Sequence, residues 1–454
     1  MRTRFLDRHM LSRIFALAWP TMLEEFMQTA VQYIDTAMVG RLGTQATAAV
    51  GATSTVNWLI GSTVSALGVG FLALIAQARG AGNTEKAKSA AAQACTVTLI
   101  AGLLFTLITV SLSPAVPVWM QVDPAIRPLA SGYFAILYAP MLFRAASIIL
   151  GTVLRAAGDT RTPMRVGILV NAANVVLNFF LIYETRQVFG VTVFGAGLGV
   201  HGAALASAVA YALGGTLIFL ALWRHPDISP RGRRFSPDKA ILTPCFRVAM
   251  PNMVQRFGTS LGYVVFASLI NALGGTSTAA HTIANTVESA FYIPGWGMQT
   301  AAATLAGFAF GAKNRNELKR LGNAMLPLEI GLMIVSGALL FLFAEPLVRL
   351  FSADESVIAL STRVLKMVAV SEPFYGVPIV VEGMMQGCGD TKLPLLFSLA
   401  GMWGVRILGT FVTTRLLSMG LVSAWGCMIG HNLLLFVLFG MTFISGRWMR
   451  NLDS

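Results

Sequence analysis

Charged residues are scarce in this chain of 454 residues. They make up 12% of the sequence, whereas a soluble domain carries about 25%. Hydrophobic residues account for 55%, the mean hydropathy is +0.69, and apolar stretches of roughly 20 residues recur from end to end. A helix of that length crosses the hydrocarbon core of a bilayer. The shortage of charge therefore excludes a soluble catalytic domain and indicates an integral membrane protein.

Residues that build disulfides, metal centres and nucleophilic sites are also few. The four cysteines stand singly in apolar sequence, with neither disulfide nor zinc spacing: Cys95, Cys245, Cys388 and Cys427. The five histidines are just as scattered: His9, His201, His225, His281 and His431. A membrane-embedded transferase would need a nucleophile or a metal cluster, and direct drive by ATP would need a Gly-rich phosphate loop. The sequence offers none of these, so we expect no catalytic residues, no cofactor and no bound metal.

What the chain does contain is an internal repeat at a constant offset of 231 residues. Pro20 matches Pro251, Asp123 matches Asp354, and the run Gly158-Asp159-Thr160 matches Gly389-Asp390-Thr391. The register holds without a gap across about 140 residues. The matches gather on Gly, Pro and Asp, which turns require for backbone reasons. Duplicated membrane halves are typical of secondary transporters, in which the substrate site lies between the repeats.

Apolar stretches predict twelve membrane spans. They lie near residues 13–38, 52–77, 89–112, 130–153, 164–183, 196–222, 243–270, 280–309, 321–343, 358–385, 394–414 and 421–445. Six spans per half is an even number, so both halves enter from the same side and form a parallel pseudo-two-fold repeat. The expected fold is an all-α membrane protein of two six-helix lobes. We expect residues 1–222 to form the N-terminal lobe, 223–242 a cytoplasmic inter-lobe loop, and 243–454 the C-terminal lobe.

The net charge of +13 is unevenly placed. Most Lys and Arg residues lie before the first span, in the even-numbered loops, or after the last span. This is the positive-inside pattern, and it predicts a multi-pass protein of the cell inner membrane with both termini in the cytoplasm. The densest basic cluster lies in the inter-lobe loop: Arg231, Arg233, Arg234 and Lys239. Its position suits a topology signal in contact with anionic lipid, and not a nucleic-acid site.

Four sequence motifs appear in the N-terminal half. They are Trp19-Pro20, the run from Asp35 to Gly43, the run from Gln77 to Asn83, and the run from Leu154 to Pro163. Their order and spacing resemble the multidrug and toxic compound extrusion (MATE) family. The resemblance implies two six-helix lobes and antiport that exports amphipathic, often cationic compounds against inward flow of H+ or Na+. Na+-coupled members carry a Glu about two turns into the seventh span. Here that stretch, Pro251 to Ser260, has no carboxylate and carries Arg256 instead.

The ionisable residues, unlike the turn residues, are not duplicated. At the constant offset Asp35 corresponds to Phe266, Asn57 to Glu288, and Met141 to Glu372. Each such group costs at least about 2.5–3.5 kcal/mol at mid-membrane unless it is paired or hydrated. Because duplication does not explain these residues, they are the best guide to the chemistry.

The first span carries a polar face. Glu24, Gln28, Gln32 and Asp35 are spaced i, i+4, i+8 and i+11, which places all four on one side of a helix. We interpret this face, with the neighbouring Glu25, as a stripe that binds the coupling proton or cation. The alternative is a polar seam that joins two helices.

Candidate substrate-binding residues lie on three further spans. They are Asn174 and Asn178 on the fifth, His281, Asn285, Glu288 and Tyr292 on the eighth, and Glu372, Tyr375 and Glu382 on the tenth. The eighth span is then interrupted by Pro294-Gly295-Trp296-Gly297, and Pro373 and Pro378 are expected to break the regularity of the tenth. His281 alone also fits a packing histidine, and Asn174 and Asn178 fit an interhelical hydrogen-bond seam as well as a cavity wall. We expect Arg256 and Arg406 to neutralise Glu372 or Glu382 as buried ion pairs.

These residues predict a central cleft between the lobes that exports small organic cations. H+ on Asp35 is the expected coupling ion, because one desolvated carboxylate can bind a proton whereas Na+ needs several oxygen ligands together. Na+ stays the alternative, with Glu24, Gln28 and Gln32 as further ligands. The second hypothesis is a flippase of lipid-linked saccharides or another amphipathic lipid, for which a more cationic cavity is expected. We expect a functional monomer in the bilayer, with no nucleic-acid partner.

The topology can be tested by cysteine labelling. In a variant whose four natural cysteines are replaced by serine, a cysteine at position 232 should react only with reagents applied from the cytoplasmic side. A cysteine at position 187 should react from outside, because the odd-numbered loops carry few basic residues. Labelling of position 232 from outside would overturn the twelve-span topology.

Overall fold

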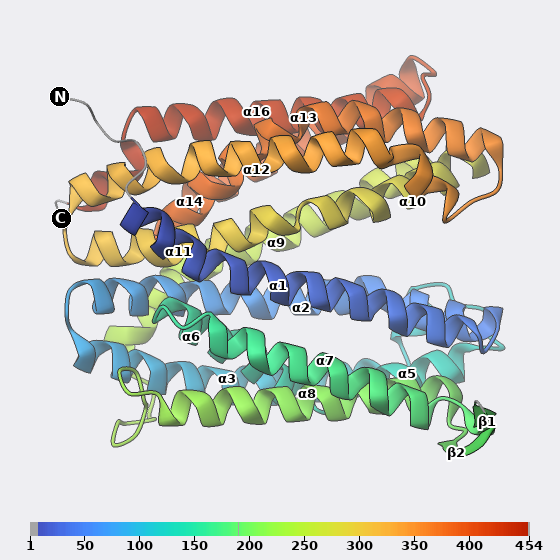
Figure 1. Ribbon diagram of the computed structural model, residues 1–454, viewed down its shortest axis with the longest axis horizontal. Coiled ribbons are helices and arrows are strands. Elements are labelled where there is room, and N and C mark those ends of the chain that lie inside the picture. The colour runs from blue at the N-terminus through green and yellow to red at the C-terminus, as the bar shows by residue number, and fades with distance from the viewer. Residues whose placement is uncertain (1–7, 189, 453–454) are drawn as a thin grey trace. The chain divides into compact units, whose positions relative to one another are not determined.

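The computed structural model describes residues 8–188 and 190–452 and is almost entirely helical (Figure 1). The first half contains α1 (Arg8–Gly40), α2 (Thr44–Gly80), α3 (Thr84–Leu112), α4 (Val116–Trp119), α5 (Arg127–Tyr138), α6 (Met141–Ala156), α7 (Arg161–Leu181), β1 (Glu184–Val188), β2 (Val191–Ala196) and α8 (Gly199–Arg224). The second half contains α9 (Lys239–Asn271), α10 (Gly275–Phe291), α11 (Ile293–Gly311), α12 (Arg315–Arg349), α13 (Glu355–Gly387), α14 (Lys392–Leu399), α15 (Leu408–Phe411) and α16 (Leu421–Ile444). Two π-helical segments, Ala400–Ile407 and Val412–Leu416, flank α15, and a 3₁₀ turn spans Arg447–Leu452.

Each of the twelve expected spans falls on one helix or on a run of consecutive helical segments; the span expected at 394–414 is the run Lys392–Leu416, which contains α14, α15 and the two π-helical segments. The span expected at 130–153 is the pair α5 and α6, bent by 50°, and the span at 280–309 is α10 and α11. Among the described residues, nine helices are long and apolar enough to cross a membrane, and the bent pair makes a tenth. Two of the twelve expected spans are not among these ten: the polar α1 and the interrupted α10–α11 pair. The all-helical fold class is thus confirmed.

The repeat is visible in the backbone of the turns that end the helices. Gly158 and Gly389 adopt φ of +92° and +83°, and Gly43 and Gly274 adopt +109° and +105°, a region that favours glycine. The hydrogen bonds match as well: the Asp159 amide donates to the Leu154 carbonyl at 3.0 Å, and its counterpart Asp390 donates to Met385 at 2.9 Å. The positions that duplicate in the sequence therefore set the same turn twice.

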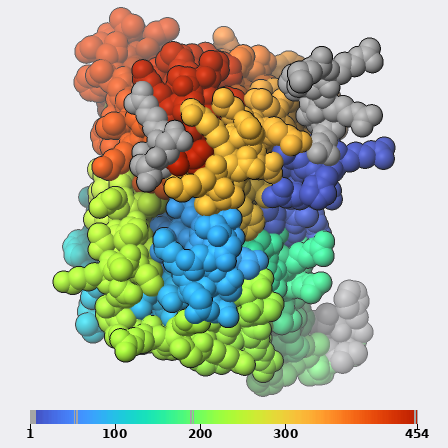
Figure 2. All heavy atoms as spheres, turned by 90° about the vertical axis from the view of Figure 1, so that its left-hand side faces the viewer, coloured from blue at the N-terminus to red at the C-terminus, as the bar shows by residue number. Residues whose placement is uncertain are grey.

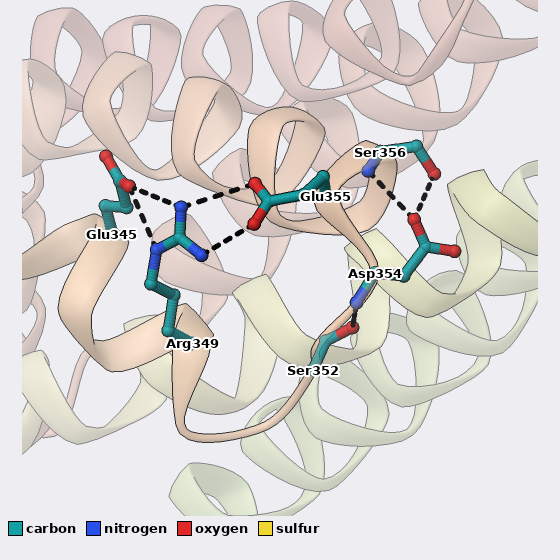
Figure 3. Close-up of polar contacts among 6 residues, drawn as sticks. All are labelled: Glu345, Arg349, Ser352, Asp354, Glu355 and Ser356. Carbon is teal, nitrogen blue, oxygen red and sulfur yellow. Dashed lines mark hydrogen bonds and ion pairs between the residues drawn. The ribbon is translucent and has the colours of Figure 1, made fainter.

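Asp123 and Asp354 show the same equivalence with side chains. One carboxylate oxygen of each accepts the backbone N–H two residues ahead, Ala125 and Ser356 respectively, at 2.8 Å. In the second half this Asp directly precedes α13, and Glu355, the first residue of that helix, pairs with Arg349, which also pairs with Glu345 (Figure 3). Hydrogen bonds from the Ser356 hydroxyl and N–H hold the pKa of Asp354 below its ordinary value. Asp354 therefore caps the helix as a carboxylate. The stability that this cap gives the folded protein is lost as the pH falls through that pKa.

The chain divides into two compact units. The N-terminal unit comprises Leu23–Phe71 and Thr84–Pro244, and the C-terminal unit comprises Met1–Met22, Leu72–Asn83 and Cys245–Ser454. The change of unit after Pro244 lies beside the end of the expected inter-lobe loop. The start of α1 and the end of α2, however, pack with the second half of the chain, which the sequence-based lobes do not anticipate.

Within the C-terminal unit, the end of α2 crosses the end of α11 without intervening side chains. A methyl group on Gly80 would lie 2.0 Å from the Phe308 carbonyl oxygen, and one on Gly311 would lie 1.9 Å from that of Gln77. These two contacts are exchanged by the offset of 231, so the crossing follows the pseudo-two-fold repeat. Small residues allow such close backbone approach in membrane proteins, where van der Waals packing holds helices together.

The inter-lobe loop is fastened to α3 inside the N-terminal unit. The Gln93 side chain donates to the carbonyls of Arg234 and Ser236 and accepts from the Asp238 N–H, at 2.9–3.2 Å. The Phe235 ring stacks on Trp223 with centroids 6.3 Å apart. In Figure 2 the inter-lobe loop is part of the yellow-green surface. One glutamine thus fixes a segment that the sequence presents only as basic.

Three features of the fold were not predicted or were predicted wrongly. The expectation that Pro373 and Pro378 break the tenth span is wrong, because α13 continues through both prolines. The π-helical segments and the antiparallel β1–β2 hairpin, in which Arg186 pairs with Val193, leave no clear pattern in the sequence. The interruption near Pro294 is confirmed, since α10 ends at Phe291 and α11 begins at Ile293.

The glycine crossing gives a direct test of packing. Gly311→Ala should lower the free energy of unfolding by about 1–3 kcal/mol, because the new methyl meets a backbone carbonyl that cannot rotate away. Gly331→Ala on α12 is the control, since no heavy atom lies within 4 Å of its added methyl. Thermal unfolding in detergent measures both variants. Equal stability of the two would refute the close crossing.

Candidate functional site

Asp35 anchors a cluster of polar side chains in the N-terminal unit. It is half-buried on α1, and its carboxylate accepts a hydrogen bond of 2.5 Å from the Asn178 amide nitrogen on α7. With the Asn174 amide oriented to satisfy both of its ends, that nitrogen donates to both Asp35 oxygens at 2.9 and 3.2 Å, and its oxygen accepts from Ser207 on α8 at 3.1 Å. The structure thus brings three sequence-predicted residues together and adds Ser207.

Glu24 belongs to a different environment from Asp35, although both lie on α1. The Arg155 guanidinium donates to both Glu24 oxygens at 2.7 and 2.8 Å, and the two side chains are 17% and 8% exposed. Glu25 is half-buried, whereas Gln28 and Gln32 are exposed. The predicted stripe therefore holds a compensated carboxylate at one end and Asp35 at the other. The sequence identifies Arg155 only as part of a loop motif.

A second cationic group in the N-terminal unit is Arg144, which the sequence reading passed over. Its guanidinium donates to the Asn57 side-chain oxygen at 2.6 Å, and its carbon lies 5.0 and 5.6 Å from the ring centres of Tyr211 and Tyr138. Asn57 also accepts from the Tyr138 hydroxyl at 2.7 Å. The sequence does give one indication of Arg144: it is a basic residue inside an expected span, and such residues are functional candidates by default.

The C-terminal unit holds a separate acidic and aromatic cluster. The Tyr292 hydroxyl donates to Glu288, which is 3% exposed, at 2.5 Å. The Tyr292 ring lies 5.0 Å from that of Tyr375 on α13. This arrangement joins residues of the eighth and tenth expected spans, as the sequence predicts.

Two more carboxylates are buried in the same unit. Glu372 is 1% exposed and Glu329 is fully buried, and neither makes a hydrogen bond to any described residue. Glu329 packs against Gly295 at the α10–α11 break and against Gly376 on α13. A buried carboxylate in this position must hold a proton, bind a cation or be hydrated.

The expectation that Arg256 and Arg406 form buried ion pairs with Glu372 or Glu382 is wrong. Glu382 is half-buried and accepts instead from the amides of Gln255 and Gln386, at 3.0 and 3.1 Å. Arg256 donates to Asn252 at 3.3 Å. Arg406 faces aromatic rings, with Phe266 and Tyr263 at 4.3 and 4.8 Å. Neutral amides and π-faces therefore make the direct contacts, and the charge of Arg256 acts on Glu382 from beyond ion-pair distance.

The two remaining candidates, His281 and Asn285, lie on α10 with Glu288. The His281 ring makes edge contacts with Phe266 and Trp425, at centroid distances of 5.6 and 5.9 Å. Asn285 is exposed. The candidates thus lie in both units, and the predicted cleft between the lobes stays a prediction.

Comparison with known proteins connects this arrangement to transporters. The MatE family model matches residues 20–180 and 251–412, two stretches that begin 231 residues apart. A probable multidrug resistance protein NorM from Thermotoga maritima is 27% identical over 435 residues, covering 96% of this chain and 92% of the relative. The probable multidrug resistance protein YoeA of Bacillus subtilis is 25% identical and covers 89% and 87%.

Solved structures show the same fold. An outward-facing multidrug resistance MATE family transporter superimposes with a TM-score of 0.88 at 24% identity, covering 97% of this chain and 96% of the other. A MOP superfamily transporter from Pyrococcus furiosus, whose binding pocket of reverse polarity suggests a different function, gives 0.87 with the same identity and coverage.

The Glu24–Arg155 pair predicts a strongly non-additive pair of substitutions. Glu24→Gln should destabilise the protein by about 1–3 kcal/mol, because the Arg155 guanidinium would lose the carboxylate that accepts its hydrogen bonds, while Glu25 still acts on it. The double variant Glu24→Gln/Arg155→Met should recover most of that loss. Thermal unfolding of the three proteins measures the coupling. Additive losses would show that the two groups do not compensate each other.

Proposed function

Because the chain belongs to the MatE family of membrane transporters, we propose that it is a multidrug efflux antiporter that exports amphipathic organic cations in exchange for H+. The curated relatives are named multidrug resistance proteins, which supports efflux. The family and the fold assign transport and not enzyme activity.

The observation that carries this proposal is the environment of Asp35. Its carboxylate receives hydrogen bonds from neutral amides, and no cationic side chain pairs with it among the described residues. Glu24, on the same helix, is already neutralised by Arg155. Asp35 therefore retains a negative charge that a proton or a cationic substrate can use.

The exchange follows from that single charge. In the outward-facing state a proton binds Asp35, cancels its charge and releases the cation. Loss of the proton to the cytoplasm restores the charge and favours binding of the next substrate. Binding of one species then opposes binding of the other, which is the requirement for antiport.

The same geometry supports H+ over Na+. Na+ binding needs several oxygen ligands at once, whereas Asn174 and Asn178 direct their amide nitrogens at the carboxylate. The acidic cluster of the C-terminal unit supports a cationic substrate. Glu288 and Glu372 supply negative charge there, and the Tyr292 and Tyr375 rings offer faces that attract organic cations.

The alternative function, flipping of an anionic lipid-linked saccharide, has one observation in its favour. Arg144 presents a guanidinium that no carboxylate neutralises among the described residues. The several unpaired carboxylates weigh against it, since they would repel a phosphate headgroup. We propose further that the chain works as a monomer in the inner membrane with both termini in the cytoplasm.

Asp35→Asn should abolish proton-driven export while leaving the protein folded, because the amide keeps the size of the side chain and one acceptor oxygen but cannot take up a proton. The measurement is efflux of a fluorescent organic cation from proteoliposomes under an imposed pH gradient. Asp123→Asn is the matched control, since this carboxylate caps an exposed turn. Glu24→Gln should reduce transport less.

Separate gradients decide the coupling ion. A pH gradient alone should drive export, and a Na+ gradient at equal pH should not. Robust Na+-driven export, or unchanged proton-driven export by Asp35→Asn, would overturn this assignment.

A further inference from the structure

Arg406 is a buried cation of the C-terminal unit that the proposed exchange does not use. It lies on the π-helical segment Ala400–Ile407 and is 4% exposed. Its Nη2 contacts the Met428 thioether at 2.9 Å, and thioether sulfur is a weak acceptor. Among the described residues no carboxylate lies within ion-pair distance of Arg406, and its Nε has no hydrogen-bond partner.

Further buried polar side chains lie on α16, which packs against this π-helical segment. Trp425 and His431 flank Met428 on α16, with exposures of 0% and 6%. The Trp425 Nε1, both His431 ring nitrogens and the His281 Nδ1 also have no partner within the described chain. His281 contacts both Trp425 and the Phe266 ring that Arg406 covers, and both histidines lie within electrostatic range of Arg406.

The cluster has a positive charge and buried N–H donors, and among the described residues no carboxylate lies within ion-pair distance of that charge. The acid within electrostatic range of Arg406 is Glu288, whose carboxylate is bound to the Tyr292 hydroxyl. Leaving a buried donor without an acceptor costs about 1–3 kcal/mol, and more for a charged group. The Arg406 Nε and the Trp425 Nε1, which have no partner among the described residues, are therefore costly to bury unless they bind something.

This polar group is not part of the duplicated scaffold. At the offset of 231, His281 corresponds to Val50 and Arg406 to Val175. The first half thus builds the equivalent positions with apolar residues. The fold itself requires neither the guanidinium nor the imidazole, which separates this cluster from the repeated packing and turn positions.

We propose that Arg406, Trp425, His431 and His281 form a buried binding site for a monovalent anion. The guanidinium supplies charge and a planar fork of donors, and the indole and imidazole N–H groups complete the coordination. Chloride and the carboxylate group of a small molecule share this chemistry. The site depends on neither the coupling ion nor the exported substrate, so its test is independent of the proposed antiport.

Anion titrations of the purified protein test the site. The protein is held in detergent in sulfate at constant ionic strength, and chloride, bromide or acetate is added. Its melting temperature should rise with chloride and bromide, because a ligand of the native state stabilises it. Crystals grown in bromide should show an anomalous peak within hydrogen-bond distance of Arg406 and Trp425. A response to acetate alone would assign the site to a carboxylate ligand.

Three variants locate the effect. Arg406→Gln should abolish the anion response. Trp425→Phe, which keeps a ring but removes one N–H, should weaken the apparent affinity about tenfold, as expected for a hydrogen bond to a charged ligand. Arg144→Gln is the matched control, because that guanidinium also lies against two aromatic rings but in the other unit.

The proposal fails if none of the three anions raises the melting temperature and bromide gives no anomalous peak, the result expected when water satisfies these donors. It also fails if Trp425→Phe responds like the natural protein, or if Arg144→Gln loses the response.

Discussion

The constraint on which this structure depends is the free energy of a charge that is removed from water. In a membrane interior each ionisable side chain must be paired, hydrogen-bonded or neutralised by a proton or ligand. The N-terminal unit uses two of these solutions on one helix. Glu24 is paired with Arg155, whereas Asp35 is held by amides of α7. The difference matters because a pair cancels its charge internally, and amides stabilise a charge without cancelling it.

The C-terminal unit meets the same constraint differently. Glu288 relies on a tyrosine hydroxyl, and Glu329 and Glu372 have no hydrogen-bond partner among the described residues. Arg406 rests on aromatic rings, although a carboxylate would neutralise it more completely. Separating acids from bases in this way is costly compared with pairing them. The separation is understandable if each group is to exchange a proton or a ligand, because an internal ion pair would compete with that exchange.

The backbone was more predictable from the sequence than the site. The span positions follow from hydropathy, and the repeated turns follow from Gly and Asp at fixed spacing, for example Gly158 and Gly389. These are local rules. The wrong expectation for Pro373 and Pro378 shows their limit, since packing around α13 keeps the helix continuous. Site residues were found by type and helix face, but a single helix does not reveal its neighbour. For that reason Arg155 was missed as the partner of Glu24, and the ion pairs of Arg256 and Arg406 were assigned wrongly.

Duplication explains why the two halves share a backbone scaffold. It does not explain how they differ in ligand preference. A symmetric scaffold offers equivalent positions in each half, and identical residues there would give both units the same affinity for every ligand. Asp35 corresponds to Phe266, and Glu288 corresponds to Asn57. At each of these pairs of positions only one half of the chain carries an acidic residue. Phe266 in turn carries Arg406 on its ring face. The position that holds an acid in the first half therefore supports a cation in the second. Since the frame supplies no asymmetry at these positions, any difference in ligand preference between the two units has to come from such unmatched residues.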